Sequence, residues 1–377
     1  MTQLTPHNEQ ETTYEWLLRA LGGVVDGPTS PMLARPDADD ARLLFPLSTR
    51  HATVGALRRG HDDRTVKARA LSAAGRAAGR AGVVSRLGGE RIEMPLTRAV
   101  RSVQGLLGDP ELTVSIGAGP PRRNRKPVLM LIRADGEVAG FAKVGWSPFT
   151  EDLVRNEFHI LTRLDGNLPS PILSPAPLEL IDLDGVVVAV TSAFASTEWK
   201  GPRALLPEQI DGIARSVGNR EVPVAELAWL RTPDIGERTD EAQSRLAEAV
   251  ALVRARFSDE VVEVGIWHGD LNPWNLVSGP SGVGVIDWEF GGFDRPVGQD
   301  RRHLRFESIR RKAVSDSTDV VARFVALEQL GPSTDVELAI YLADLALRES
   351  RLSGQGWTSP MAGYRQPLTE AIEGLLA

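Results

Sequence analysis

Short apolar runs separated by turn residues fill the stretch between residues 111 and 190, and they limit what it can fold into. Asp135-Gly136 stands between two such runs, a position in which Asp-Gly is typical of a β-hairpin. The turn Asp182-Leu183-Asp184-Gly185 separates a further pair. The pattern therefore predicts hairpins, with strands at residues 112–116, 128–133, 137–144, 178–181 and 186–190.

One amphipathic helix accompanies these runs. Residues 151–164 place their apolar side chains on one helical face. Strands around a single helix predict a small α+β lobe, which we place at residues 106–195. Beyond that point the candidate elements are mostly helical. We therefore expect a β-rich lobe followed by a larger helical lobe at residues 196–377.

Residues 1–105 form an N-terminal extension whose pattern is mixed. Residues 13–21 predict a short amphipathic helix, and prolines mark turns before an apolar run at residues 42–46. Residues 66–84, rich in Ala, Arg and Leu, favour a second helix whose arginines face either a phosphate or solvent. We expect an α/β extension of unknown role.

The composition excludes several classes of protein. The 377 residues include 42% hydrophobic and 25% charged residues, which is typical of a globular chain with more than one core. The chain has no cysteine, so disulfides, thiol nucleophiles and zinc–thiolate sites are excluded. The net charge of −7 argues against binding nucleic acid over the whole surface.

The apolar runs are too short for a membrane-spanning helix, which needs roughly 18 to 20 residues. Residues 1–7 lack the basic start and the apolar stretch of a secretory signal. We therefore expect a cytoplasmic protein that does not associate with a membrane.

Residues 268–289 contain the most informative motif. The sequence His268-Gly269-Asp270-Leu271-Asn272-Pro273-Trp274-Asn275 precedes a glycine-rich turn and an apolar run that ends at Asp287. Two carboxylates and an amide are thus delivered from a loop and a strand end. Such residues can also merely close a turn around Pro273. Two linked motifs in this order, each beside strand-like runs, favour a functional cluster.

Phosphoryl transfer from ATP needs an aligned nucleophile, a held polyphosphate and a magnesium ion that neutralises developing charge. Magnesium prefers hard oxygen ligands, and Asn275 and Asp287 fit that preference. Asp270 can then accept or orient the proton of the acceptor hydroxyl. The Asp-x4-Asn spacing from Asp270 to Asn275 matches the catalytic loop of kinases. We therefore expect ATP and Mg²⁺ as cofactors.

This segment resembles the catalytic core of the aminoglycoside phosphotransferase and choline kinase-like family, whose members have a protein-kinase-like fold. His268-Gly269-Asp270 and Asn275 match that family's catalytic loop, and Ile286-Asp287 matches its magnesium-binding strand end. The resemblance implies a bilobal fold with a small β-rich N-lobe and a larger helical C-lobe. It does not cover the extension.

The same resemblance gives three residues a supporting role. His268 belongs to the catalytic-loop motif. Trp288-Glu289 is closer to choline and ethanolamine kinases than to the glycine-containing aminoglycoside version. Pro296 and Asp300 resemble a motif in which a later aspartate buttresses the catalytic loop. We therefore expect His268, Glu289 and Asp300 to support the site.

A kinase-like lobe also needs a strand lysine that contacts the α- and β-phosphates, and a helix glutamate that holds this lysine. Lys143 lies at the end of the predicted strand 137–144, and Glu157 lies on the following helix. Lysine is scarce in this chain, which makes the placement informative. The alternatives are a strand-end lysine with a buried stem and an ordinary exposed glutamate.

The loop that covers the phosphates is expected at residues 115–119. Ser115, Gly117 and Gly119 would approach the nucleotide there through backbone N–H groups. A full glycine-rich fingerprint is missing, so ATP and GTP are not distinguished. Four basic residues either cover the triphosphate or keep a hairpin tip soluble: Arg122, Arg123, Arg125 and Lys126.

The expected function is ATP- and Mg²⁺-dependent phosphorylation of a hydroxyl group on a small molecule, such as a sugar, a glycoside or an amino alcohol. By resemblance, residues 190–195 would form the hinge that receives adenine, although Phe194 could instead belong to the core. Two alternatives stay open: an aminoglycoside-type antibiotic phosphotransferase, and a nucleotide-binding pseudokinase or scaffold without turnover. The sequence identifies neither the acceptor nor the oligomeric state.

Overall fold

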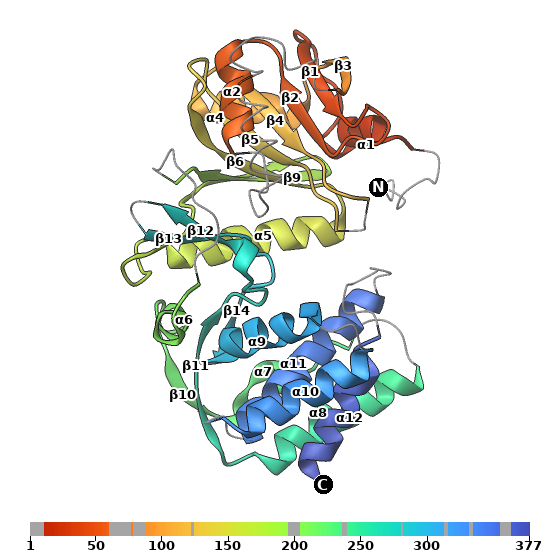
Figure 1. Cartoon of the computed structure of the whole chain (residues 1–377), viewed down its shortest axis with the longest axis vertical. Coiled ribbons are helices and arrows are strands. Elements are labelled where there is room, and N and C mark those ends of the chain that lie inside the picture. Colours follow the sequence, from red (N-terminus) through yellow and green to blue (C-terminus); the bar gives the residue numbers. More distant parts are fainter. Residues whose placement is uncertain are drawn as a thin grey trace. The chain divides into compact units, whose positions relative to one another are not determined.

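The structure is a computed structural model, and it describes residues 11–59, 77, 88–121, 124–194, 204–235, 240–279, 282–312, 316–331, 335–354 and 363–377. The chain divides into two units (Figure 1). The first unit comprises residues 1–165, 170–203 and 274–289. The second comprises residues 166–169, 204–273 and 290–377.

An eight-stranded antiparallel sheet forms the centre of the first unit. Its strands lie in the order β3-β1-β2-β4-β5-β6-β9-β8 (Figure 1). Their bounds are β1 Ser30–Arg35, β2 Leu43–Pro46, β3 Glu90–Met94, β4 Thr113–Gly117, β5 Val128–Ile132, β6 Val138–Gly145, β8 Pro177–Leu183 and β9 Val186–Ser192. β5 pairs with β6 and β8 pairs with β9, so both predicted hairpins are confirmed.

The extension continues this sheet. β2 pairs with β4, so the strands β1, β2 and β3 add to one edge of the predicted lobe. Trp16 and Leu17 of helix α1 (Thr13–Ala20) lie in the same hydrophobic core as Ala142 of β6 and Val188 of β9. The predicted α/β character of the extension is confirmed. The helix predicted at residues 66–84 falls on residues that the structure does not describe, apart from position 77.

Local sequence signals explain where two helices of the first unit begin. α1 starts after Thr12, whose hydroxyl accepts the Glu15 N–H while the Glu15 carboxylate accepts the Thr12 N–H. α5 (Pro148–Leu164) starts after the N-cap Ser147, with proline at its first position. This helix confirms the one predicted at 151–164 and extends it by three residues at its start. The unit also contains α2 (Arg50–Arg59) and α4 (Arg98–Leu107).

A second, small sheet in the first unit carries part of the candidate site. β12 (Leu276–Gly279) pairs antiparallel with β13 (Gly282–Val285), and β13 pairs parallel with β7 (Ile172–Leu173). The short 3₁₀ helix Pro273–Asn275 leads into β12. The sequence assigned this hairpin to the helical lobe, whereas in the structure residues 274–289 belong to the first unit.

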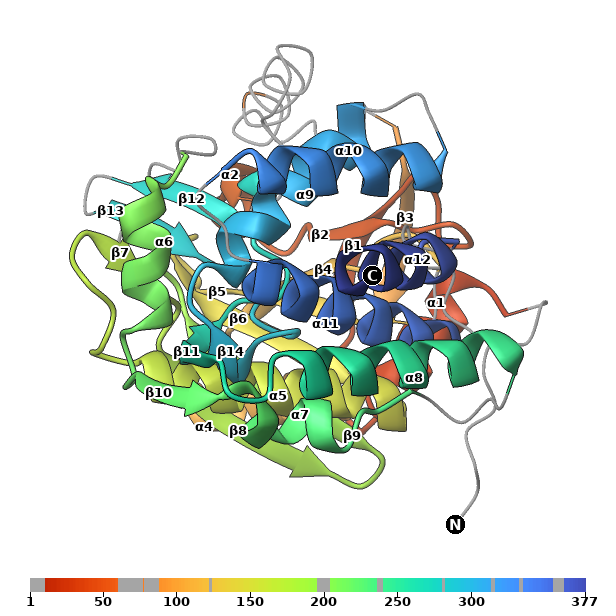
Figure 2. The same ribbon diagram turned by 90° about the horizontal axis from the view of Figure 1, so that it is seen from below.

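The second unit is mostly helical. Its three antiparallel strands are β10 (Arg220–Pro223), β11 (Val261–Trp267) and β14 (Gly292–Pro296). Its helices are α6 Pro207–Ala214, α7 Ala228–Arg231, α8 Glu241–Arg256, α9 Gln299–Lys312, α10 Ser317–Gln329, α11 Asp335–Gly354 and α12 Arg365–Leu376, with one 3₁₀ turn at Val224–Glu226. In Figure 2, α8, α11 and α12 run side by side, and their buried side chains share one core. The predicted α+β class, β-rich first and helical second, is confirmed.

No helix within the described ranges combines the length and the apolar character that crossing a membrane requires.

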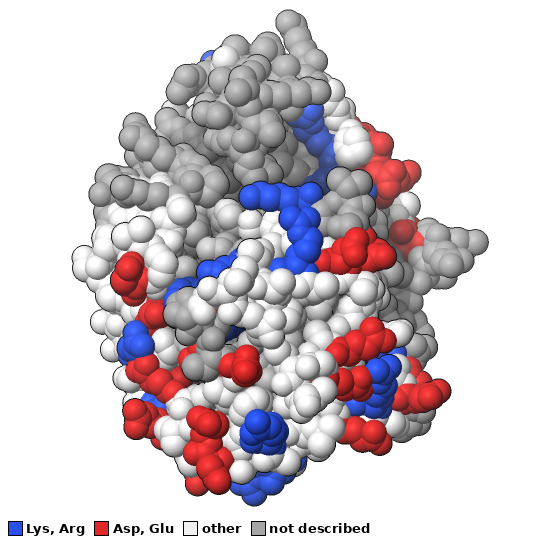
Figure 3. Space-filling model, turned by 60° about the horizontal axis from the view of Figure 1, so that its bottom comes forward, with Lys and Arg blue, Asp and Glu red and all other residues white. Residues whose placement is uncertain are grey.

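Acidic and basic side chains are interspersed over the lower part of the molecule in Figure 3. Within the second unit, solvent-accessible ion pairs join Arg215 to Glu263 and Arg245 to Glu373. Exposed pairs of this kind contribute little to the stability of the fold, because water and salt screen them.

Candidate active site

The β12–β13 hairpin positions Asn275 and Asp287 close to its two ends. Asn275 is 3% exposed and precedes β12, and its carbonyl accepts the N–H of Ile286 at 3.0 Å. Asp287 follows β13 with φ of 71°, in the left-handed region. Residues other than glycine rarely adopt this backbone conformation, because it costs about 1–3 kcal/mol of strain, and it clusters at functional sites. The backbone of Asp287 at the end of the hairpin therefore has the kind of conformation that is found at functional sites.

Lys143 of β6 reaches two carboxylates of this unit. Its Nζ lies 2.8 Å from Oε1 of Glu157 and 2.6 Å from Oδ1 of Asp287. Burial alone would lower the pKa of Lys143, but the negative charges of Asp287, Glu157 and Glu289 raise it above its ordinary value. The ammonium group therefore stays charged. The ion pair between Lys143 and Glu157 that the sequence predicts is present, and the contact with Asp287 joins it to the candidate metal position.

Glu289 has a partner that the sequence did not indicate. Its Oε2 lies 2.6 Å from Nζ of Lys126, and both side chains are less than a tenth exposed. Burial raises the pKa of Glu289, and the charge of Lys126 opposes that shift. Glu289 also extends the acidic group, because oxygens of Glu157, Asp287 and Glu289 all lie within 4.8 Å of one another.

These side chains fit a magnesium ion by their chemistry. Carboxylate and amide oxygens are hard donors, and Mg²⁺ usually takes one or two carboxylates together with phosphate and water. Asp287 supplies such a carboxylate, and the hairpin keeps Asn275 near it in the fold. Glu289 is a further acidic side chain of this cluster. The assignment of Asn275 and Asp287 as ligands stays a prediction.

A cavity of about 320 Å³ opens beside Lys143 and Asp287. Its walls are mostly apolar and come from β5, β6, α5 and β9, with Val128, Phe141, Leu161, Ala189 and Phe194 among them. Gly284 allows the close approach of the Phe194 ring, because a Cβ there would lie 2.6 Å from a ring carbon. The apolar cavity thus has a lysine and two carboxylates, Glu157 and Asp287, in its lining.

The predicted phosphate loop is bound to the extension. The hydroxyl of Ser115, 2% exposed, donates to the Leu44 carbonyl at 2.8 Å. Gly117 ends β4, within the ladders of β2 and β5. The N–H of Gly119 donates to the Arg42 carbonyl at 3.3 Å. A phosphate role for these three residues stays a prediction, and it requires the Gly119 N–H to exchange its partner.

Arg125 does not lie at a solvated hairpin tip, because its side chain is buried. It is 4% exposed, its Nε donates to the Ala118 carbonyl at 2.9 Å, and its guanidinium stacks 4.0 Å from the ring of Trp16. The Trp146 indole N–H donates to the Arg125 carbonyl at 2.7 Å. Arg125 therefore joins the loop to helix α1. Arg122 and Arg123 lie outside the described residues.

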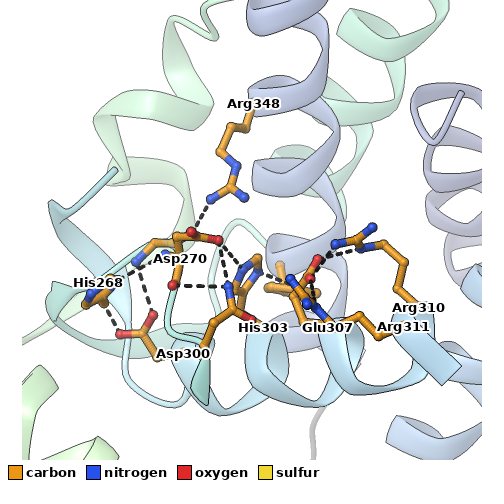
Figure 4. A network of polar contacts seen from close by, with 11 residues as sticks. His268, Asp270, Asp300, His303, Glu307, Arg310, Arg311 and Arg348 are labelled. Carbon is orange, nitrogen blue, oxygen red and sulfur yellow. Dashed lines mark hydrogen bonds and ion pairs between the residues drawn. The ribbon is translucent and has the colours of Figure 1, made fainter. Parts of the chain in front are cut away.

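In the second unit, Asp300 holds the loop that contains Asp270 (Figure 4). Its carboxylate accepts the backbone N–H groups of His268 at 2.7 Å and Gly269 at 3.1 Å. Gly269 has φ of 78°, and a Cβ there would lie 2.2 Å from the Phe290 carbonyl oxygen. Only glycine fits this position without a shift of the backbone. These bonds have the geometry expected of a buttress.

Asp270 lies in a network of donors. Its Oδ1 accepts from Asn272 Nδ2 at 2.9 Å and lies 3.4 Å from Nε2 of His303. Burial alone would raise the pKa of Asp270, but the His303 hydrogen bond and the charges of Arg348, His303 and His268 hold it below its ordinary value. Asp270 is therefore ionised near neutral pH, as a proton acceptor must be.

Sequence reasoning missed Asn272, His303 and Arg348 as parts of this network. His303 had one usable signal, because it follows Asp300 by three residues and so shares a face of α9 with it. Arg348, which donates to the Gly269 carbonyl, comes from α11 and had no local signal.

The predicted residues thus gather in two groups. Lys143, Glu157, Asn275, Asp287 and Glu289 lie in the first unit. His268, Asp270 and Asp300 lie in the second. The approach of Asp270 to the acidic cluster of the first unit stays a prediction.

Comparisons with known proteins address the family of this chain. Residues 147–297 match the family described as "Phosphotransferase enzyme family". No curated protein matches the chain.

Three solved structures illustrate the range of similar proteins. A thermostable mutant of aminoglycoside phosphotransferase APH(4)-Ia, in complex with ADP and hygromycin B, is 11% identical in sequence, with a TM-score of 0.46. The match covers 73% of this chain and 97% of the phosphotransferase chain. Choline kinase LicA from Streptococcus pneumoniae is 18% identical, with a TM-score of 0.45, and the match covers 73% of this chain and 96% of LicA. Amicoumacin kinase hAmiN is 12% identical, with a TM-score of 0.41, and the match covers 70% of this chain and 88% of hAmiN. These low identities say nothing about an acceptor. Over residues 147–297, the chain is thus similar to the phosphotransferase enzyme family.

Proposed function

We propose that this protein transfers the γ-phosphoryl group of ATP to a hydroxyl group of a small molecule. The observation that carries the proposal is the ion-pair chain from Glu157 through Lys143 to Asp287, set in the lining of an apolar cavity. A strand lysine held by a helix glutamate beside a metal-binding aspartate is the arrangement with which kinases grip a nucleotide. The family match over residues 147–297 agrees with phosphotransfer.

The cavity would receive the nucleotide. Its apolar walls suit a planar base, and the charged ammonium of Lys143 suits the α- and β-phosphates at the cavity's polar end. Thr191 and Ser192 line it at the end of β9, within the segment expected to receive adenine. The nucleotide would thus be oriented with its phosphates toward Asp287.

Asn275 and Asp287 would hold the magnesium ion. When bound, Mg²⁺ would supply neutralisation of the charge on the transferred phosphoryl group. Asp287 contributes its carboxylate from a fixed backbone position, and Lys143 restrains that carboxylate from β6. Asn275 would contribute an amide from the residue that precedes β12.

Asp270 would accept or orient the proton of the acceptor hydroxyl. Its depressed pKa keeps it ionised, and Asn272 and His303 fix the direction of its carboxylate. Asp270 and Asn275 are five positions apart in the chain, which limits the distance between their Cα atoms to about 18 Å. The acceptor belongs to the class of sugars, glycosides or amino alcohols.

A screen for ADP release tests the proposal. Purified protein with Mg–ATP is offered sugars, amino alcohols and aminoglycosides, and Asp270→Asn is run beside the wild type. We expect acceptor-dependent ADP release by the wild type and a large loss in the variant, with nucleotide binding retained by both. Turnover confined to aminoglycosides would identify an antibiotic phosphotransferase. Equal inactivity of both proteins, with Mg–ATP still bound, would favour the scaffold.

A further inference from the structure

Lys126 connects the segment between β4 and β5 to the acidic cluster of Glu157, Asp287 and Glu289. It lies two residues before β5, at the end of the segment that follows β4. Its Nζ is 2.6 Å from Oε2 of Glu289, and the two side chains are 7% and 8% exposed. Enclosing both charges carries a desolvation cost that only close pairing offsets. A lysine in such a place is therefore a specific link rather than a solvated surface group.

The partner of Lys126 lies next to the candidate metal position. Glu289 follows Asp287 by two residues, and their carboxylate oxygens lie within 4.8 Å of each other. Lys143 contacts Asp287 and Glu157, whereas Lys126 contacts Glu289. Each lysine thus serves its own part of the cluster. Without Lys126, Glu289 would be a buried negative charge beside Asp287 and would compete for Lys143.

The backbone next to Lys126 is anchored on its other side. Arg125 bonds to the Ala118 carbonyl and to the hydroxyl of Thr13 at 3.0 Å, and its ring partner is Trp16. The extension thus holds the residue before Lys126, while Lys126 itself reaches Glu289. This segment is thus attached on two sides, through Arg125 to the extension and through Lys126 to Glu289.

We propose that Lys126 is a positioning residue of the nucleotide site, which acts through Glu289 on the carboxylate of Asp287. The inference rests on the proposed function. By neutralising Glu289, Lys126 leaves Lys143 and Asp287 available to the polyphosphate and its metal ion. Lys126 therefore governs the binding of Mg–ATP and not the proton transfer at Asp270.

Calorimetric titration with Mg–ATP tests this role without requiring turnover. We expect Lys126→Met to weaken Mg–ATP binding about 10-fold or more, which is typical for loss of a residue that orients a metal ligand. Lys126→Arg, which keeps the charge, should retain most of the affinity. In a double-mutant cycle, Glu289→Gln should weaken the effect of Lys126→Met, because the uncompensated charge is then absent.

Arg155→Met is the matched control. Arg155 forms an ion pair of the same length, 2.6 Å, with Asp182 in the same unit, but both side chains are exposed. Its loss should leave Mg–ATP affinity unchanged. A purely structural role of Lys126 would lower the melting temperature and leave the affinity of the folded variant at the wild-type value, which would overturn the inference.

The possible results separate the two proposals. A wild type that binds Mg–ATP, with equal affinity in Lys126→Met, overturns the inference and leaves the proposed function standing. A wild type that binds no Mg–ATP overturns both. If Lys126→Met does not fold, the variants Lys126→Arg and Glu289→Gln decide. Retained Mg–ATP affinity in Lys126→Arg together with altered affinity in Glu289→Gln supports the inference. Any other pattern overturns it.

Discussion

Nζ of Lys143 lies 2.6 Å from Oδ1 of Asp287, although the two residues are 144 positions apart in the chain. The contact forms because residues 274–289 return to the first unit and form the β12–β13 hairpin there. Glu157 holds the same ammonium group from α5. The first unit thus brings together the lysine, its glutamate and the candidate metal-binding aspartate.

Replacement of Lys143 by Met should abolish most activity. The variant loses the cation that faces the phosphates, and removal of one such electrostatic contact typically costs about 10²–10³-fold in kcat. It also leaves Asp287 and Glu157 without their shared partner, so the melting temperature should fall. Steady-state kinetics and thermal unfolding measure the two effects. Wild-type kcat/KM for ATP in a folded variant would contradict the role of Lys143.

His303 should set the acid side of the pH–rate profile. Burial favours protonated Asp270, and the His303 hydrogen bond opposes it, so His303→Ala should raise the pKa of Asp270. Because the ionised carboxylate is the active form, the acid limb of kcat should move to higher pH. His303→Asn, which can still donate to Oδ1, should move it less. Superimposable acid limbs in all three proteins would refute this role.

The same shift has a consequence for stability. The pKa of Asp270 is lower in the folded state than in the unfolded state, so its ionisation contributes to the free energy of unfolding. This contribution is fully present above the unfolded-state pKa and is lost as the pH falls through the folded-state pKa. His303→Ala should therefore destabilise the protein more at neutral pH than in acid. Urea unfolding across a pH series measures the difference, and a pH-independent difference would argue against it.

Gly269→Ala should be far more damaging than the same change at Gly166. Both residues have positive φ, 78° and 71°, and both lie in the second unit. An added Cβ at Gly269 would lie 2.2 Å from the Phe290 carbonyl oxygen, whereas nothing lies within 4 Å at Gly166. The free energy of unfolding of Gly166→Ala should fall by about 1–2 kcal/mol, because alanine is strained in the left-handed backbone conformation. Chemical denaturation measures both, and equal losses would show that the clash is relieved easily.

Arg125 should determine how firmly the extension is held. Arg125→Met removes the cation–π contact with Trp16, worth about 0.5–2 kcal/mol, together with the hydrogen bonds to Ala118 and Thr13. We expect faster amide hydrogen exchange in α1 and at residues 118–119. Arg133, whose side chain is 44% exposed in its ion pair with Asp109, supplies the control Arg133→Met. Unchanged exchange in α1 would rule out the anchoring role.

Local sequence patterns were enough to predict much of the fold. Both hairpins and helix α5 followed from alternation, Asp-Gly turns and a single apolar face, all of which depend on neighbours in sequence. The Lys143–Glu157 pair was also accessible, because the strand and the helix that carry it are consecutive.

The remaining features depend on contacts between distant segments. Nothing near Arg125 indicates that it stacks on Trp16, and nothing near Lys126 indicates Glu289. The attachment of β2 to β4 likewise pairs the extension with a strand that lies beyond α4 in sequence. Such contacts are set by the packed fold and leave no periodic trace in the chain.

Binding of ATP to the wild type and to Asp287→Asn, titrated by calorimetry with Mg²⁺ and again with EDTA, tests the account most directly. We predict that the wild type binds ATP tightly only with Mg²⁺, and that Asp287→Asn loses most of this dependence. ATP affinity that is the same with Mg²⁺ and with EDTA in the wild type, or the same Mg²⁺ dependence in the variant, would contradict a metal–nucleotide site at Lys143 and Asp287.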